Sequence, residues 1–213
     1  MLKAKKISDY VYEEILENIV QLKYQPGEKI SESQLAREIG VSRAPIKSAL
    51  AKLESEGLVS IRPQNGTFVS KISVERARNI CDVRMLLETY AVRIAAERVT
   101  DQELEKVQKL FDQMNAIPDE NEEKRQFIYD TDGRLHDLIY EISGNTIVGE
   151  VIERYRPEIR RIQYANMTWM NRKVPTQIEM KKIFAALRDH DPDAAEQAMR
   201  EHLSNIKKAV ETM

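Results

Sequence analysis

The fold is decided by one stretch near the start of the chain, Pro26–Val69, which reads PGEKISESQLAREIGVSRAPIKSALAKLESEGLVSIRPQNGTFV. A serine-rich segment precedes a short helical run over Gln34–Ile39, and serine side chains cap the free amides at helix starts. Gly40 ends that helix, and a second helix is predicted over Arg43–Gly57. Two helices joined by a tight turn that contains glycine are typical of a helix-turn-helix.

The flanking segments complete a small domain. Before the motif, apolar residues recur at three- and four-residue intervals over Ile7–Leu22, which predicts an amphipathic helix. After it, two β-branched runs flank the pair Asn65-Gly66, and Asn-Gly is the strongest short-range signal for a β-hairpin. Residues 1–71 are therefore expected to form a winged helix-turn-helix of three helices and a hairpin wing.

The second helix of the motif begins with a polar and basic tip. Ser42, Arg43, Ala44 and Lys47 lie at its start, whereas apolar residues follow at helical spacing. Recognition helices contact base edges with their N-terminal residues, and helix N-termini also suit phosphate oxygens. The tip is therefore a candidate DNA-binding surface; the alternative is a small helical module with a hairpin that binds protein.

Composition agrees with a helix-rich globular protein. The chain has 213 residues, of which 42% are hydrophobic and 32% charged, and its formal net charge is −2. Residues 1–71 carry 11 Lys and Arg against 9 Asp and Glu, so the charge permits DNA binding without demonstrating it. The single cysteine, Cys81, suits a reducing compartment, and no apolar run approaches the ~20 residues of a membrane span. We expect a cytoplasmic protein.

Residues 72–213 are expected to form a second, all-helical domain, which makes the protein mainly α. The periodicity predicts an antiparallel bundle of about six helices, a fold that can house a ligand pocket. In the first of these helices, Val83, Leu86 and Tyr90 are assigned to the apolar side, and Asp119–Lys124 is expected to be a solvated charged loop. The expected helices cover residues 74–98, 100–117, 126–143, 146–169, 175–187 and 191–210.

The quoted stretch resembles the winged-helix signature of the GntR family almost position by position. Three later segments resemble the ligand-binding domain of the fatty-acid-regulator (FCD) subgroup: VRMLLETYAVRIAAE (Val83–Glu97), DTDGRLHDLIYEISGN (Asp130–Asn145) and LRDHDPDAAEQAMREHL (Leu187–Leu203). The resemblance implies a bacterial transcription repressor that binds a double-stranded DNA operator as a homodimer and senses a small molecule. A dimer is also expected because one short helix reads few base pairs, whereas two half-sites multiply specificity.

The resemblance assigns roles to individual residues of the first domain. It implies that Arg43 reads a guanine and that Lys47 stands where a second arginine commonly holds phosphate or base. Lysine keeps the charge but loses the bidentate fork, so this contact should discriminate less between bases. Gly66 would let the wing backbone approach the minor groove. The full set of expected DNA contacts is Ser33, Arg37, Ser42, Arg43, Ala44, Lys47, Asn65 and Gly66.

A metal site is a further candidate. Asp132 and His136 lie four residues apart, so on a helix both point the same way and can chelate one ion. The resemblance adds His202 as a ligand and places another histidine where this chain has Met180. A thioether is a poor ligand for Zn²⁺ compared with imidazole. A bound Zn²⁺ or Ni²⁺ is therefore expected to be weakened or absent, and the alternative is a hydrogen-bonded remnant of the site.

Arginines mark candidate positions for the effector. Arg84 matches the arginine of the subgroup's R-x-x-L-E pattern. Arg160 and Arg161, in the middle of a predicted helix, are rival candidates, and Met180 is added as a pocket residue. Guanidinium forks fit carboxylates, so an acidic metabolite is expected.

Two other functions compete with the transcription regulator. One is a metal-dependent hydrolase that uses Asp132, His136 and His202, and the other is a helical protein-interaction scaffold. No separate nucleophile or general base pairs with those three residues in the sequence, and no Ser/His/Asp or Cys/His constellation is found. We therefore expect a regulator rather than an enzyme.

Overall fold

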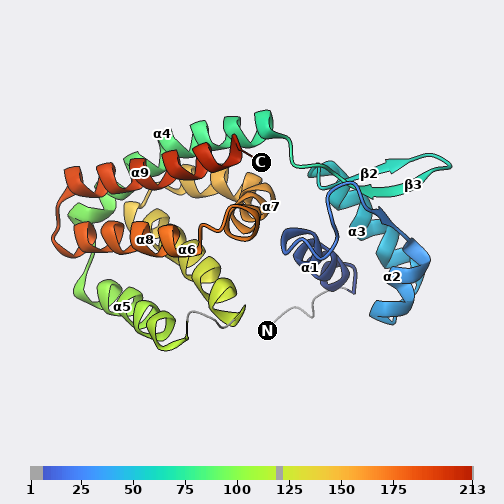
Figure 1. The fold of residues 1–213 in the computed structure, drawn as a ribbon, viewed down its shortest axis with the longest axis horizontal. Helices are drawn as coiled ribbons and strands as arrows, with labels where there is room; N and C mark the ends of the chain where they lie inside the picture. Colours follow the sequence, from blue (N-terminus) through green and yellow to red (C-terminus); the bar gives the residue numbers. More distant parts are fainter. Residues whose placement is uncertain (1–6, 119–121, 213) are drawn as a thin grey trace. The chain divides into compact units, whose positions relative to one another are not determined.

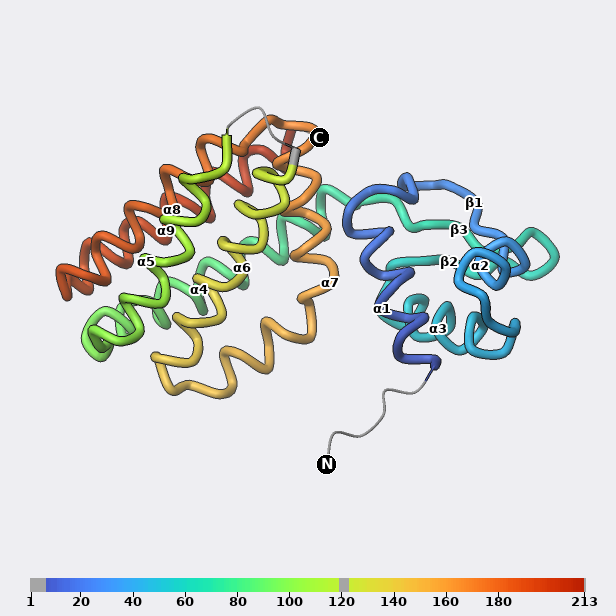
Figure 2. Tube along the Cα trace, turned by 90° about the horizontal axis from the view of Figure 1, so that it is seen from below, coloured from blue at the N-terminus to red at the C-terminus, as the bar shows by residue number. Residues whose placement is uncertain are grey.

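The computed structural model describes residues 7–118 and 122–212. The described chain separates into two compact units (Figures 1 and 2). The first contains the residues up to Ser73 together with Pro157–Tyr164, and the second contains the remainder from Val74 onward. Each unit is described by itself below.

The first unit is a winged helix-turn-helix, as predicted. The helices α1 and α2 both pack against α3, and the core between them contains fully buried Ile15, Ile46 and Leu50. The sheet is antiparallel in the order β1-β3-β2, and its first strand was not expected from the sequence. The elements are α1 (Ile7–Val20), β1 (Lys29–Ile30), α2 (Glu32–Ile39), α3 (Arg43–Ser55), β2 (Val59–Arg62) and β3 (Gly66–Val69).

Local chemistry sets the boundaries of α2. The Ser31 side chain accepts a hydrogen bond from the backbone N–H of Gln34, which satisfies one free amide of the first turn. At the other end, Gly40 adopts a left-handed conformation with φ 74° and donates its N–H to the carbonyl of Ala36. The predicted serine cap and glycine stop are both confirmed.

The turn of the wing is centred on residues that precede the Asn65-Gly66 pair from which the hairpin was predicted. The backbone N–H of Asn65 donates to the carbonyl of Arg62, so Pro63 and Gln64 are the central turn residues. Gln64 has a φ of 66°, and proline followed by a positive φ is the pattern of a type II turn. Gly66, with φ 103°, is already the first residue of β3 and is paired with Arg62.

The six helices predicted after the winged domain are all present, and they make up the second unit except for Pro157–Tyr164 of α7, which belongs to the first. Thr100 and Glu103 form a reciprocal capping box at the start of α5. The helices are α4 (Val74–Arg98), α5 (Asp101–Ala116), α6 (Glu122–Ser143), α7 (Thr146–Trp169), α8 (Lys173–Arg188) and α9 (Pro192–Val210).

Part of the charged segment 119–124, which the sequence predicts to be a loop, is helical. Residues 119–121 lie outside the described residues, but α6 already begins at Glu122. Lys124 is buried, and its ammonium donates to the carbonyl of Ile117 at 2.7 Å. This hydrogen bond to the end of the preceding segment offsets the cost of burying the charge.

The long helix α4 buries a different face from the predicted one. It runs beside α9 (Figure 1) and also packs against α6 and α8. Val83, Leu86 and Tyr90 are exposed by 42%, 75% and 50%, whereas Arg84 and Glu88 are exposed by only 3% and 0%. The assignment of these three apolar residues to the core is therefore wrong for this chain. The buried face consists mainly of small residues around this ion pair, which lets the neighbouring helices approach closely.

Candidate DNA interface and buried histidine cluster

The start of α3 presents the residues singled out for DNA. Ser42, Arg43, Ala44 and Lys47 are all exposed. Ser42 is the N-cap residue by position, but its side chain makes no capping hydrogen bond. Neither Arg43 nor Lys47 has an ion pair with another described residue, so both cations are available to phosphates or base edges.

The weaker candidates lie on α2 and the wing. The hydroxyl of Ser33 is 3.0 Å from that of Ser31, next to the cap of α2, and Arg37 is exposed. Asn65 is exposed at the turn. A Cβ added to Gly66 would lie 2.8 Å from Cε of Lys29 and would require a positive φ, so a side chain at this position is strained.

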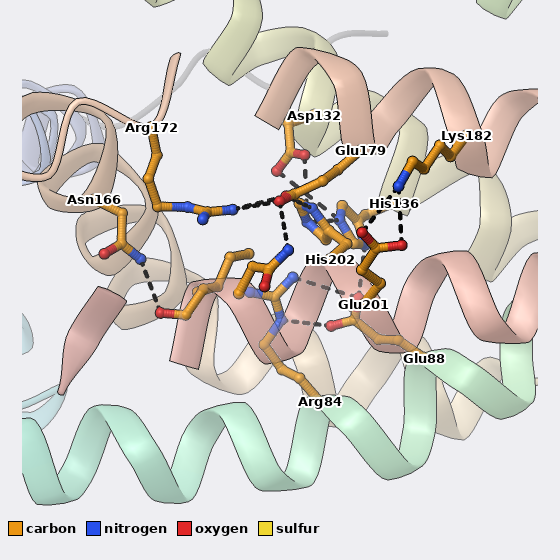
Figure 3. Close-up of polar contacts among 12 residues, drawn as sticks. Arg84, Glu88, Asp132, His136, Asn166, Arg172, Glu179, Lys182, Glu201 and His202 are labelled. Atoms are coloured by element: carbon orange, nitrogen blue, oxygen red, sulfur yellow. Dashed lines mark hydrogen bonds and ion pairs between the residues drawn. The ribbon is translucent and has the colours of Figure 1, made fainter. Parts of the chain in front are cut away.

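Inside the bundle, α6 and α9 bring together Asp132, His136 and His202 (Figure 3). The two Nε2 atoms of the histidines are 3.3 Å apart. Oxygens of Asp132 lie 3.9 Å from Nε2 of His136 and 3.6 Å from Nε2 of His202. All three side chains are buried, so two imidazole nitrogens and one carboxylate converge on a single enclosed point.

The opposite edge of each imidazole faces another carboxylate. Oε2 of Glu88 on α4 lies 2.6 Å from Nδ1 of His136, and Oε2 of Glu179 on α8 lies 2.9 Å from Nδ1 of His202. A carboxylate at Nδ1 favours the tautomer with the proton on that nitrogen. With both protons on Nδ1, the two Nε2 atoms would present their lone pairs on the side of Asp132 and could bind a cation there.

Glu88 and Glu179, which we call the outer carboxylates, each form an ion pair with an arginine. Arg84 donates from Nε to Glu88 at 2.5 Å, and Arg172 donates to both oxygens of Glu179 at 2.8 and 2.7 Å. The side-chain amide of Asn205 donates to Glu179 at 2.9 Å. Since a buried charge without a partner is strongly unfavourable, these pairings are what permit two carboxylates so deep in the bundle.

The charges shift the protonation equilibria of the cluster. Burial alone would raise the pKa of Glu88, but Arg84 and His136 hold it well below its ordinary value. Burial alone would lower the pKa of His136, yet Glu88 raises it above the ordinary histidine value. The pKa of Glu179 is lowered in spite of its burial, because His202 and Arg172 favour the carboxylate. Both outer glutamates are therefore anionic at neutral pH.

This donor set fits a divalent transition metal. Imidazole nitrogen and carboxylate oxygen are ordinary ligands of Zn²⁺, and a site with three protein ligands keeps a position open for water or another oxygen ligand. Carboxylates behind metal-binding histidines are a recurrent feature of such sites. The residues present therefore fit the divalent metal that the sequence offered as a candidate.

The other sequence candidates lie in different surroundings. Arg84 is part of the cluster through Glu88. Met180 is fully buried on α8, immediately after Glu179. Arg160 belongs to the first compact unit rather than to the cluster, and its guanidinium pairs with Glu17 of α1.

Three members of the cluster were missed at the level of the sequence: Glu88, Glu179 and Arg172. Glu88 ends the R-x-x-L-E pattern that drew attention to Arg84, so a hint was present for this residue. Glu179 and Arg172 lie in a segment without any recognisable motif. Only the packing of α8 against α9 brings Glu179 to His202.

Two family models match the chain. The one described as bacterial regulatory proteins, gntR family, matches residues 7–69, and the one described as FCD domain matches residues 79–205.

Throughout residues 7–118 and 122–212, each helix is too short or too polar to cross a membrane.

Similar proteins agree with both models. The chain is 30% identical to the HTH-type transcriptional repressor RspR of Escherichia coli (strain K12), over 97% of this chain and 90% of that protein. It is 28% identical to the HTH-type transcriptional repressor NanR of Cronobacter sakazakii, over 96% and 85%. A solved structure titled E. coli McbR/YncC has the same fold, with a TM-score of 0.79 at 19% identity, covering 98% of this chain and 99% of that one. The chain thus belongs to the GntR family of bacterial regulatory proteins, in the group with an FCD domain, and is a DNA-binding transcription regulator.

Proposed function

We propose that the protein is a cytoplasmic repressor that binds its operator as a homodimer and responds to a small acidic metabolite at the histidine cluster. The observation that carries the proposal is the convergence of Asp132, His136 and His202 inside the FCD domain. Repression is inferred from the relatives RspR and NanR, whose names describe them as repressors.

The DNA-binding half of the proposal rests on the exposed tip of α3. Arg43 would make a base-specific contact, because its guanidinium can bond two acceptors of a guanine at once. Lys47 would hold a phosphate as a point charge. Ser33, Arg37, Ser42, Ala44, Asn65 and Gly66 would support these contacts from α2, the start of α3 and the wing.

The sensing half rests on the donor set of the cluster. Asp132, His136 and His202 would hold a divalent metal, which when bound supplies a Lewis acid that can take a carboxylate oxygen of the effector in its open position. Glu88 and Glu179 would orient the two imidazoles. Arg84 would both anchor Glu88 and favour an anionic ligand nearby.

Met180 is proposed to limit the affinity for the metal. Its thioether is uncharged and soft, and it stands where the family resemblance implies a histidine. Replacement Met180→His is expected to raise Zn²⁺ or Ni²⁺ content after dialysis and to increase the metal-dependent rise in Tm. Tight stoichiometric metal in the wild type, or negligible metal in both proteins, would contradict this role.

The test measures DNA and metal binding on the same full-length protein. Fluorescence anisotropy with the DNA upstream of the protein's own gene should give tighter binding than scrambled DNA, and a panel of carboxylate metabolites should change that affinity in the presence of metal. The double variant His136→Ala/His202→Ala should lose metal binding and the metabolite response. His190→Ala is the matched control, since this histidine contacts the carbonyl of Ala96 outside the cluster.

The outcomes separate the two halves of the proposal. Equal affinity for upstream and scrambled DNA would overturn operator binding at that site. An unchanged metal content in the double variant would overturn the metal site, even if DNA binding were normal.

A further inference from the structure

One face of the wing sheet carries two cations that are not among the DNA contacts expected from the sequence. Side chains alternate between the two faces of a strand, and residues paired across neighbouring strands share a face. In β3, Thr67 is buried, whereas Phe68 is half-buried on the opposite face. Lys29 of β1 is paired with Phe68. Arg62 of β2 is paired with Gly66, which lies two residues before Phe68 and therefore on the same face.

We call this surface the outer face of the wing sheet. The strands lie in the order β1-β3-β2 (Figure 2), so the two cations come from the two edge strands and flank the middle one. Both cations are exposed. The members of the outer face are Lys29, Ser60, Arg62, Gly66 and Phe68.

The ring of Phe68 holds both cations near one point. Nζ of Lys29 lies 5.9 Å from the centroid of the ring, and Cζ of Arg62 lies 4.6 Å from it. Both distances are within the range of a cation–π contact. A guanidinium that lies over a ring keeps the N–H donors at its edge for another acceptor. The ring therefore restricts the positions of the two charges without neutralising either of them.

The missing side chain of Gly66 lets Lys29 cross the middle strand. A Cβ at position 66 would lie 2.8 Å from Cε of Lys29 and 3.6 Å from its Nζ, and the first distance is too short for two carbon atoms. The aliphatic stem of Lys29 therefore lies over the bare backbone of Gly66. Since Arg62 is paired with Gly66 from the other side, this path brings the ammonium of one edge strand toward the guanidinium of the other.

The two charges have no anionic partner within the chain. Among the residues that the structure describes, no carboxylate forms an ion pair with Lys29 or Arg62. Two cations held beside one ring repel each other, and an anion bound by both would offset this repulsion. A phosphate oxygen is such an anion, and both side chains can donate charge-assisted hydrogen bonds to it.

We propose that Lys29 and Arg62 bind the phosphate backbone of DNA on the outer face of the wing sheet, with Phe68 as their positioning residue. This inference rests on the DNA-binding half of the proposed function and adds a contact surface to it. The surface is continuous with the expected wing contact, because Gly66 belongs to both. The ammonium of Lys29 is a point charge, which suits a phosphate better than the paired acceptors of a base.

The salt dependence of DNA binding by the full chain tests these contacts. In anisotropy titrations, Lys29→Ala/Arg62→Ala should weaken binding to the upstream DNA and to scrambled DNA alike. The slope of log affinity against log salt should fall by about two units, one for each phosphate contact. The loss relative to the wild type should therefore shrink about tenfold between about 50 and 200 mM salt.

The matched control is Lys182→Ala/Arg188→Ala, which also removes one lysine and one arginine, at exposed positions of α8. It should leave the slope as in the wild type, and both double variants should show a normal thermal melt. An unchanged slope in Lys29→Ala/Arg62→Ala would overturn the proposal, and so would a loss confined to the upstream DNA. Scrambled DNA reports on phosphate contacts by itself, so a failure of operator recognition would leave this result intact.

The role of the ring is tested by Phe68→Leu, which removes the aromatic face but keeps an apolar side chain. It should weaken binding to both DNAs about 2- to 5-fold, the equivalent of an exposed cation–π contact. In the Lys29→Ala/Arg62→Ala background the same substitution should have no further effect, because Phe68 acts through the two cations. An equal loss in both backgrounds would show that the ring only supports the sheet and would overturn its positioning role.

Discussion

The tip of α3 and the histidine cluster of the bundle are assembled in opposite ways. The tip takes Ser42, Arg43, Ala44 and Lys47 from one short stretch at the start of α3 and leaves all four exposed. The cluster draws on α4, α6, α8 and α9, and its side chains are buried and bound to one another. A surface that must meet DNA keeps its charges free, whereas a site enclosed in protein has to neutralise every charge that it contains.

The sharpest test of this contrast is the stability of variants that remove one arginine. Arg84→Met leaves Glu88 buried without its main partner and is expected to lower the free energy of unfolding by about 3–5 kcal/mol. Arg43→Ala, at an exposed residue, should change it by no more than about 0.5 kcal/mol. Urea unfolding measures both. Adding Glu88→Gln to Arg84→Met should recover part of the loss, and equal stabilities of the Arg84 and Arg43 variants would break the comparison.

DNA affinity, unlike stability, should depend on the exposed Arg43. Arg43→Ala is expected to weaken specific binding about 10- to 100-fold, because one bidentate base contact is worth about 1–3 kcal/mol. Arg188→Ala, at an exposed arginine of α8, is the control and should bind as the wild type does. Anisotropy titrations with the operator measure the effect, and an unchanged affinity with a normal thermal melt would show that Arg43 is not a reading residue.

Measurements of metal affinity test whether the carboxylate of Glu179 supports His202 as a ligand. Glu179→Gln keeps the shape of the side chain but removes the charge at Nδ1 of His202, so the metal affinity should fall about 10- to 100-fold. The control is Glu201→Gln on α9, whose carboxylate pairs with Lys182 at the surface (Figure 3). Competition with a chelating indicator gives both constants, and equal values would show that Glu179 does not orient His202.

The smallest expected effect concerns the salt dependence of DNA binding. Lys47→Ala should weaken binding to operator and random DNA alike and reduce the slope of log affinity against log salt by about one unit. Lys182→Ala serves as the control on the bundle. If the loss is confined to one base position while the slope stays the same, Lys47 reads sequence rather than phosphate.

The sequence by itself determined the elements whose signals are local. The cap at Ser31, the stop at Gly40 and the capping box at Thr100 act within a few residues, and all three are found where their chemistry predicts. The same holds for the α3 tip, because a helix start presents neighbouring residues in order. The strand β1 escaped prediction because two residues, Lys29–Ile30, become a strand only through pairing with β3.

Tertiary structure alone decided which face of α4 is buried and what surrounds the histidines. By hydrophobicity Leu86 and Tyr90 belong inside and Glu88 outside, yet the bundle buries Glu88 with Arg84 and exposes the other two. The buried carboxylate of Glu88 is tolerated because it pairs both with Arg84 of its own helix and with His136. His136 belongs to α6, far away in the sequence. The physical reason is that the free energy of a buried charge depends on partners distant in the chain, so no pattern within α4 could reveal it.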